Sequence, residues 1–181
     1  MNKAVLRKSI AEHLHRVTPE TRRTASEFIV QSLVSLPEFV AAETVLLFAS
    51  LPREPDVELL WKRSESHGKR LVYPRVEGSE LGLYEALTPK ELAPGRWGLR
   101  EPVAVPERRI FPVEIDFATV PGVAFTPSGE RLGRGGGYYD RLLATATKAF
   151  KVGVCFDFQV LSQLPIESHD IVVDRVVTEH G

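Results

Sequence analysis

The first forty residues carry apolar positions at a helical period. An N-terminal helix is predicted from apolar residues spaced by four and three, namely Leu6, Ile10, Leu14 and Val17. Thr18 and Pro19 form an N-cap and first-turn signal for a second helix, which Pro37 ends. The face of this helix that we expect to be buried contains Ala25, Phe28, Ile29, Leu33 and Leu36.

Further along the chain, short apolar runs predict strands. A nearly continuous run over 44–50 is typical of a strand covered on both faces. A third helix follows, which Asp56 caps and Gly68 ends. Its apolar positions are Val57, Leu59, Leu60 and Trp61. The remaining strands are expected at 70–74, 81–86, 116–125, 151–156 and 170–177, and a last helix at 138–150.

The order of these elements predicts the fold class. Strands alternate with helices, which favours an α/β architecture with three layers, a largely parallel sheet flanked by helices. Residues 88–112 are rich in proline and are expected to form one long loop, a length that is often functional in a compact domain. No linker divides the chain, so 1–181 is expected to be a single domain.

Composition and charge exclude several classes of protein. Lys and Arg number 23 against 24 Asp and Glu, a balance that does not suit a protein built to coat nucleic acid or an anionic membrane. Cys155 is the only cysteine, which excludes an intramolecular disulfide and a cysteine zinc site. The first residues carry charges without a following apolar stretch, and no run has the ~20 apolar residues of a membrane span. We therefore expect a cytoplasmic protein.

A glycine cluster after a predicted strand is the most informative stretch. Five glycines fall within residues 129–137, between a strand and a helix. Such a density lets backbone N–H groups approach a bulky anion, and the following helix N-terminus adds its positive dipole end. Arg131 and Arg134 bring positive charge to the same place. These features indicate a phosphate-bearing ligand; the alternative is a flexible surface turn.

Neither common phosphate-binding motif explains the cluster. The Walker pattern is absent, because Tyr138 and Tyr139 stand where Lys and Ser or Thr are required. The dinucleotide pattern G-x-G-x-x-G also fails, since Tyr138 or Asp140 occupies the position of its third glycine.

The run from Arg131 to Arg141, RLGRGGGYYDR, strongly resembles the signature of the 5-formyltetrahydrofolate cyclo-ligases, also called 5,10-methenyltetrahydrofolate synthetases. Other segments resemble the family in the same order along the chain. They are Lys3-x-x-Leu6-Arg7, ASLPREPD at 49–56, WGLREP at 97–102, VPGVAF at 120–125, and the closing His169-Asp170 to Asp174 with Thr178-Glu179. Pro55 and Val57 depart from the family pattern that follows Glu54.

The resemblance implies an activity. The family uses ATP and Mg²⁺ to close 5-formyltetrahydrofolate into 5,10-methenyltetrahydrofolate, releasing ADP and phosphate. The terminal phosphoryl group activates the formyl oxygen, and N10 of the folate then attacks the activated carbon. In such a reaction the protein acts mainly by positioning the substrates and neutralising charge.

The resemblance also assigns residues to roles. The implied ATP-binding residues are Lys3, Arg7, Arg131, Leu132, Gly133, Arg134, Gly135, Gly136, Gly137, Tyr138 and Tyr139. The implied folate-binding residues are Ala49, Glu54, Trp97, Arg134, Gly135, Gly136, Gly137 and Tyr138. Arg134 and Tyr139 are expected to be catalytic, and Asp140 and Asp174 to bind Mg²⁺.

Some of these residues have a simpler interpretation from the sequence alone. Lys3 and Arg7 are four apart and share a helix face, which can equally be a solvated basic face. Asp140 lies in the first turn of a predicted helix, where a carboxylate also complements the helix dipole.

Two functions compete with the ligase. One is a binding module that senses a nucleotide or sugar phosphate without catalysis, and the other is a small-molecule kinase. The missing Walker lysine weakens the kinase hypothesis. We expect small molecules as partners, neither nucleic acid nor a membrane, and a monomer or small homo-oligomer.

Overall fold

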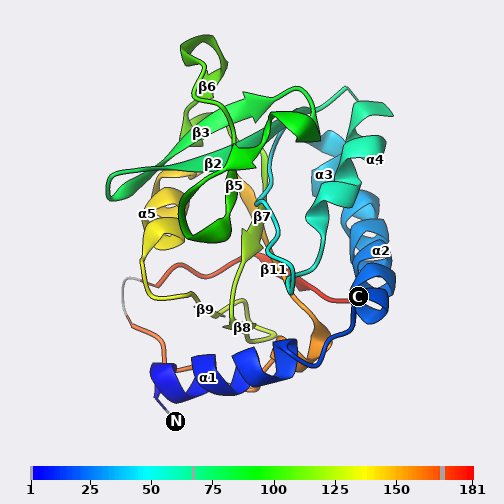
Figure 1. Cartoon of the computed structure of the whole chain (residues 1–181), viewed down its shortest axis with the longest axis vertical. Coiled ribbons are helices and arrows are strands. Elements are labelled where there is room, and N and C mark those ends of the chain that lie inside the picture. The colour runs from blue at the N-terminus through cyan, green and yellow to red at the C-terminus, as the bar shows by residue number, and fades with distance from the viewer. Residues whose placement is uncertain (1, 67, 168–169) are drawn as a thin grey trace.

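The structure, a computed structural model, describes residues 2–66, 68–167 and 170–181 (Figure 1). Within these residues seven strands form one sheet in the order β11-β10-β7-β1-β2-β3-β6. Their bounds are β1 Thr44–Leu46, β2 Arg70–Glu77, β3 Glu80–Ala86, β6 Arg109–Ile110, β7 Phe117–Pro121, β10 Phe150–Val154 and β11 Arg175–Val177. Neighbours from β11 to β2 run parallel, and β3 pairs antiparallel with both β2 and β6.

Helices cover both faces of this sheet, as Figure 1 shows. They are α2 Pro19–Ser35, α3 Pro37–Ala41 and α4 Leu60–Ser66 on one face, and α5 Tyr138–Thr145 on the other. Side chains along β1 alternate between the two: Val45 packs with the α2–α4 side and Leu46 with the α5 side. The expected three-layer α/β fold with a largely parallel sheet is confirmed.

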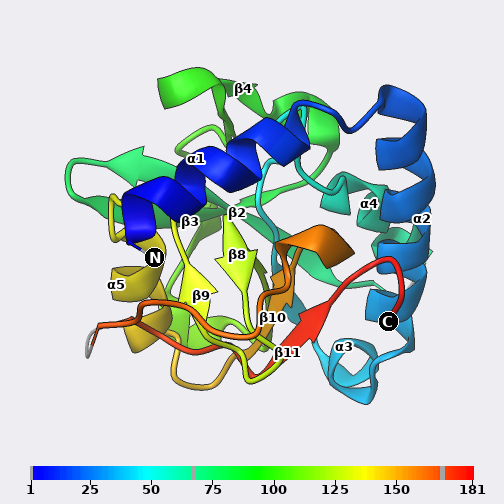
Figure 2. The same cartoon turned by 90° about the horizontal axis from the view of Figure 1, so that it is seen from below.

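Helix α1 (Lys3–Leu14) lies apart from these layers, beyond the end of β7 (Figures 1 and 2). Leu6 and Ile10 form its buried stripe and share a small apolar cluster with Leu132. Leu132 belongs to a hairpin made of β8 (Ala124–Phe125) and β9 (Arg131–Leu132), which follows β7 along the chain. The N-terminal helix therefore covers the hairpin rather than the sheet.

The segment expected to be one long loop contains short regular pieces. These are β4 Ala93–Pro94, β5 Arg100–Glu101 and the 3₁₀ turns η2 Pro89–Glu91, η3 Arg96–Gly98, η4 Pro106–Arg108 and η5 Pro112–Glu114. The other 3₁₀ turns are η1 Val57–Leu59 and η6 Asp157–Gln159. β4 pairs antiparallel with β5, so 93–101 forms a small flap, which we call the β4–β5 flap.

The helix predictions are right in place and partly wrong in detail. Thr18 caps α2 as expected, its hydroxyl accepting from the Thr21 amide at 3.1 Å. Phe28 was expected in the core but is 59% exposed. The buried face of α2 consists of Ala25, Ser26, Ile29, Val30 and Leu33, and Phe28 lies outside it. Val17 lies beyond the end of α1, and Pro37 begins the short α3 as well as ending α2.

Several predicted elements are longer than the observed ones. The apolar run was expected to be strand throughout, but β1 ends at Leu46. The apolar residues that follow, Leu47, Phe48 and Ala49, are buried outside the strand. α5 ends at Thr145, and a turn whose end residues Ala146 and Ala149 are buried leads into β10. The last strand begins only at Arg175, so the expectation of strand over 170–174 is wrong for the described residues there.

The expected strand at 116–125 is two strands, β7 and β8, divided at Gly122-Val123. A side chain at Gly122 would place its Cβ 2.5 Å from the Phe125 ring, so glycine permits the close approach of that ring where the two strands separate.

Asp116 fastens the amino ends of β1 and β7 together. Its Oδ2 accepts from the amides of Glu43 at 3.0 Å and Thr44 at 2.9 Å, and its Oδ1 lies 2.5 Å from Lys148 Nζ. Burial alone favours the neutral acid, but the Lys148 contact and the two amides outweigh it and lower the pKa of Asp116.

Replacing this carboxylate tests its contribution to stability. We expect Asp116→Asn to lower the free energy of unfolding by about 1–2 kcal/mol near neutral pH. Because the folded pKa is depressed, the contribution is complete above the unfolded pKa and is lost as the pH falls through the folded one. Urea unfolding at a series of pH values should show the two proteins converging in acid. A difference that stays constant with pH would contradict a role for the ionised group.

Candidate functional site

The connections of the sheet create a crevice at the carboxyl ends of β1 and β7. These strands are neighbours, yet β1 continues through α4 to β2 on one side, whereas β7 continues through α5 to β10 on the other. The two crossovers cover opposite faces of the sheet. A parallel sheet binds ligands at such a point, because the chains diverge and leave room between the strand ends. A cavity of about 430 Å³ lies there.

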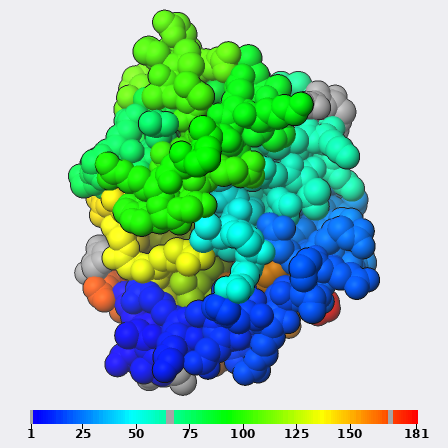
Figure 3. Space-filling view, in the orientation of Figure 1, coloured from blue at the N-terminus to red at the C-terminus, as the bar shows by residue number. Residues whose placement is uncertain are grey.

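Four segments of the chain form the walls of the cavity. They are the residues after β1 (Phe48, Ala49, Leu51 and Glu54), the strands β2 and β3 (Pro74, Val76 and Leu81), the β4–β5 flap (Trp97, Leu99, Arg100 and Glu101), and the end of β7 with the glycine segment (Pro121, Gly122, and Arg131, Gly133, Arg134 and Gly136 to Asp140). In Figure 3 the yellow glycine segment and α5 lie between the green flap, the cyan residues after β1 and the blue α1.

The glycine segment, residues 133–137, holds a backbone that other residues adopt only with strain. Gly135 has φ +107° and Gly137 φ +65°, the latter in the left-handed conformation that starts α5. Arg7 of α1 donates from Nε to the Gly133 carbonyl at 2.9 Å and so fixes the segment from outside the cavity. Gly136 and Gly137 line the cavity just before the N-terminus of α5, where anions are favoured.

Arg131 and Tyr139 bring two unsatisfied donors to the cavity wall. The Arg131 side chain is 3% exposed, and its Nη2 donates to Asp140 Oδ1 at 2.6 Å. Arg131 Nε and the Tyr139 hydroxyl are both buried, and neither has a hydrogen-bond partner among the described residues. Burial, and next the charge of Glu54, raise the pKa of Tyr139, so its hydroxyl stays protonated. Buried donors are rarely left unpaired, so these two are available to an acceptor that the described residues do not supply.

Glu54 joins the loop after β1 to the glycine segment. Its Oε2 accepts from the Leu51 amide at 3.0 Å, and its Oε1 from Arg134 Nη2 at 2.6 Å. Glu54 is buried, whereas the Arg134 side chain is 60% exposed. The contact is worth little in stability at that exposure, but it fixes both charges on the cavity wall.

The β4–β5 flap closes one side of the cavity with an aromatic contact. Trp97 is 67% exposed, and its ring centroid lies 5.7 Å from that of Tyr138. Its φ of +56° is unusual for a tryptophan, and its side chain lines the cavity. Glu101 Oε1 accepts from the Val76 amide at 3.2 Å, and Arg100 pairs with Glu58, so both anchor the flap.

Some lining residues were missed by the sequence analysis. Glu101 lies in the WGLREP segment and lines the cavity. A single glutamate in a loop does not indicate a binding role unless the residues that surround it in space are known. Val76 and Leu81 lie near the hairpin that joins β2 and β3, beyond or at the edge of the strands expected there. The signal for Val76 is the alternation of apolar residues at Val72, Pro74 and Val76, which extends the predicted strand past Pro74.

Most residues assigned by resemblance are brought together here, but not all. Ala49, Glu54, Trp97, Arg131, Arg134, Asp140 and the segment Gly136–Tyr139 line the cavity with Gly133. Leu132 does not, because its side chain packs under α1. Gly135 is exposed beside Arg7. His169 lies outside the described residues.

Lys3 and Asp174 also lie away from the cavity wall. Lys3 Nζ pairs with Glu167 and Asp170, each at 2.9 Å, and these hydrogen bonds raise the pKa of Lys3. Asp174 Oδ2 accepts from the Lys151 amide at 2.7 Å, next to the amino end of β10, and the cavity lies at the opposite ends of these strands. The structure does not bring Asp174 to Asp140.

Three carboxylates line the cavity, those of Glu54, Glu101 and Asp140, and Asp140 is the one next to the glycine segment along the chain. Its Oδ1 accepts from Arg131 and from the Ile171 amide, and no described residue donates to its Oδ2. The described part of the chain has no group of three or more His, Cys, Asp or Glu side chains that could hold a metal ion. One carboxylate fits a Mg²⁺ that arrives with substrate phosphates and keeps its waters, and does not fit an all-protein cage.

Comparisons with known proteins agree on one family. The model of the 5-formyltetrahydrofolate cyclo-ligase family matches residues 1–179. The 5-formyltetrahydrofolate cyclo-ligase of Escherichia coli K12 is 33% identical over 93% of this chain and 96% of its own. The NMR structure of Aquifex aeolicus 5,10-methenyltetrahydrofolate synthetase superposes with a TM-score of 0.89 at 42% identity, covering 100% of this chain and 91% of that one.

Two further findings concern location. The described residues contain no helix long and apolar enough to cross a membrane. The Arabidopsis thaliana relative, 25% identical over 99% of this chain and 74% of its own, is named a mitochondrial 5-formyltetrahydrofolate cyclo-ligase. Relatives of this chain are therefore not confined to the cytoplasm.

The unpaired Tyr139 hydroxyl generates a prediction about stability. Since that group gives up water without gaining a partner, Tyr139→Phe should leave the free energy of unfolding unchanged or raise it by up to about 1 kcal/mol. Tyr73 provides the control, because its buried hydroxyl accepts from Trp61 Nε1 at 2.8 Å, and Tyr73→Phe should destabilise by about 1–3 kcal/mol. Urea unfolding measures both. A loss at Tyr139 as large as that at Tyr73 would show that the Tyr139 hydroxyl is satisfied.

Proposed function

The chain belongs to the 5-formyltetrahydrofolate cyclo-ligase family, and on that premise we propose that its cavity brings ATP and 5-formyltetrahydrofolate together for transfer of the terminal phosphoryl group to the formyl oxygen. By homology over nearly the full chain the protein is a 5-formyltetrahydrofolate cyclo-ligase, an ATP-dependent ligase of folate metabolism.

The chemistry requires an oxygen to become a leaving group. The formyl oxygen of an N-formyl group leaves poorly as oxide or hydroxide. Phosphorylation by ATP releases ADP and turns the formyl group into an iminium phosphate, which N10 attacks at carbon. N10 gives up its proton, the C–O bond breaks, inorganic phosphate leaves, and the new C–N bond closes the methenyl ring. Such a reaction is accelerated mainly by alignment of the two substrates and by neutralising charge on the phosphoryl oxygens.

The unpaired donors of Arg131 and Tyr139 carry this proposal. Both lie on the cavity wall next to the glycine segment, so a phosphoryl oxygen between them would accept two hydrogen bonds that no described residue supplies. Their burial makes each hydrogen bond stronger than in water, once side chains around the cavity open enough to admit the phosphoryl oxygen. The backbone of Gly136 and Gly137 and the N-terminus of α5 would face the remaining phosphate oxygens.

The folate would occupy the other half of the cavity. Glu54 offers a carboxylate to the N–H groups of the pterin, and Val76, Leu81 and Leu99 offer an apolar surface to its ring. Trp97 and Tyr138 are placed to stack on an aromatic ring at the mouth. Arg134 contacts Glu54 and belongs to the glycine segment, so it would lie between the two substrates and balance charge on the transferred group.

Asp140 would hold a magnesium ion through its free Oδ2, together with the phosphates of ATP. When bound, Mg²⁺ withdraws charge from the phosphate oxygens and favours departure of ADP. The Arg131 guanidinium donates to Asp140 Oδ1 and so fixes the position of its carboxylate on the cavity wall. Asp174, implied as a second ligand by the resemblance, would have to be reached by a movement of β11 or of α5.

The reaction itself is the first test. The purified protein with 5-formyltetrahydrofolate, ATP and Mg²⁺ should form the methenyl product, followed by its near-ultraviolet absorbance, with one ADP released per product. Omitting ATP or chelating Mg²⁺ should abolish the signal. Folded protein that binds ATP in calorimetry but forms no product would favour the binding module, and ADP release stimulated only by another acceptor would favour a kinase.

Arg134→Ala tests the charge between the substrates. Removing this guanidinium should lower kcat/KM for ATP by about a hundredfold, because charge on the transferred group loses a preorganised partner. Stability should change little, since the Arg134 side chain is mostly exposed. Arg96→Ala is a matched control, an exposed arginine of the β4–β5 flap that does not line the cavity. Equal ATP kinetics in both variants would remove Arg134 from the mechanism.

A further inference from the structure

The loop after β1 must present Glu54 without the support of a sheet. β1 ends at Leu46, and only the Leu47 amide continues the ladder, donating to the Val72 carbonyl at 2.8 Å. From there the chain reaches a tight turn at 51–54, in which the Glu54 amide donates to the Leu51 carbonyl at 3.0 Å. The Glu54 carboxylate returns to the Leu51 amide, so the orientation of the carboxylate is set by the conformation of the turn.

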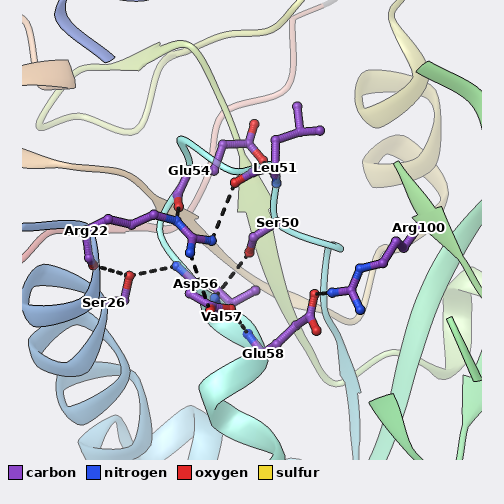
Figure 4. A network of polar contacts seen from close by, with 9 residues as sticks. All are labelled: Arg22, Ser26, Ser50, Leu51, Glu54, Asp56, Val57, Glu58 and Arg100. Atoms are coloured by element: carbon purple, nitrogen blue, oxygen red, sulfur yellow. Dashed lines mark hydrogen bonds and ion pairs between the residues drawn. The ribbon is translucent and has the colours of Figure 1, made fainter. Parts of the chain in front are cut away.

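Arg22 of α2 binds this turn on the side away from the cavity (Figure 4). Its Nε donates to the Glu54 carbonyl at 2.6 Å, and its Nη2 reaches the Leu51 carbonyl at 3.5 Å. Its Nη1 lies 3.7 Å from Asp56 Oδ2. One rigid guanidinium therefore contacts both ends of the turn and Asp56, two residues beyond it.

A second set of contacts fixes Arg22 relative to the loop. Ser26, one turn further along α2 and fully buried, donates from Oγ to the Arg22 carbonyl at 2.6 Å. The same Oγ accepts from the Asp56 amide at 2.8 Å. The backbone of α2 and the end of the loop are thus joined by one hydroxyl, and the Arg22 side chain spans the gap beside it, as Figure 4 shows.

Arg22 does not line the cavity, whereas Glu54 does. The guanidinium binds the backbone of Glu54 on one side, and the carboxylate of the same residue contacts Arg134 on the other at 2.6 Å. Because the carbonyl and the side chain belong to one residue, a shift of the turn displaces the carboxylate from its place on the cavity wall.

We propose that Arg22 is a positioning residue for folate binding: it clamps the turn at 51–54 so that the Glu54 carboxylate faces the substrate. The inference rests on the proposed role of Glu54 toward the pterin. Arg22 does not line the cavity, so its effect passes through the turn at 51–54 that presents Glu54. A merely structural role would lower the stability of the whole fold and the amount of active enzyme, leaving the KM values of both substrates unchanged.

Arg22→Ala separates these roles. In the full-length enzyme, assayed where urea unfolding shows each variant fully folded, KM for 5-formyltetrahydrofolate should rise by about tenfold or more, because a misplaced contact group costs binding. KM for ATP should rise several-fold less than KM for the folate, because Arg22 reaches the glycine segment only indirectly, through the contact of Glu54 with Arg134. Arg23→Ala is the matched control, since Arg23 is the next residue, is exposed, and pairs only with Glu27 in the same helix among the described residues.

A double-mutant cycle with Glu54→Ala tests the route of the effect. If Arg22 acts through Glu54, the double variant should have the folate KM of Glu54→Ala within about twofold. Should Arg22→Ala not fold, Arg22→Lys carries the same test, since an ammonium keeps the charge but lacks the planar fork whose three nitrogens reach Glu54, Leu51 and Asp56 separately.

Three results would overturn the inference: an unchanged folate KM in the Arg22 variant, an equal rise in both KM values, or a full additional loss on top of Glu54→Ala. Failure of the proposed function is distinguishable, because wild-type enzyme would then form no methenyl product. A normal folate KM in Glu54→Ala would remove the role of Glu54 itself.

Discussion

The divergence of the chain after β1 and β7 is the constraint on which the rest of the structure depends. Two parallel neighbours whose crossovers cover opposite faces cannot close the space above their carboxyl ends. The space is bordered instead by segments outside the sheet, which are the turn at 51–54, the β4–β5 flap and the glycine segment. Helix α1 then holds the glycine segment in place through Arg7, instead of joining the core of the sheet.

The cavity retains features that a protein selected only for stability would lose. The buried donors of Arg131 and Tyr139 are unpaired among the described residues, and Trp97 has a left-handed backbone. Each of these features costs free energy in the empty protein. They cluster within one cavity, which is where strain and unsatisfied groups are expected when a ligand supplies the missing contacts.

The sequence predicted the layers of the fold and the chemistry of its central loop, because both depend on local residue types. The glycine density at 133–137 and the Thr18 cap carry their meaning in a few adjacent residues. What the sequence could not predict depends on partners far along the chain. Phe28 faces solvent because of where α2 meets the sheet, and the role of Arg22 appears only when α2 lies against the turn at 51–54.

Resemblance and geometry agree on most of the site and differ at its edges. The family pattern selected Glu54, Trp97 and Arg134, which all line the cavity. It also selected Leu132, which packs under α1, and Asp174, which binds a backbone amide next to the amino end of β10. Glu101 lines the cavity as well but has no signal of its own in the sequence. A motif therefore identifies the neighbourhood of a site more reliably than each contact in it.

The central claim is that one cavity holds both substrates with the terminal phosphoryl group against the formyl oxygen. A crystal structure of the protein with a non-hydrolysable ATP analogue and 5-formyltetrahydrofolate measures this directly. We expect the terminal phosphate between Arg131 Nε and the Tyr139 hydroxyl, in line with the formyl oxygen, and the pterin beside Glu54. Nucleotide bound elsewhere on the surface, or a terminal phosphate turned away from the folate, would contradict the account.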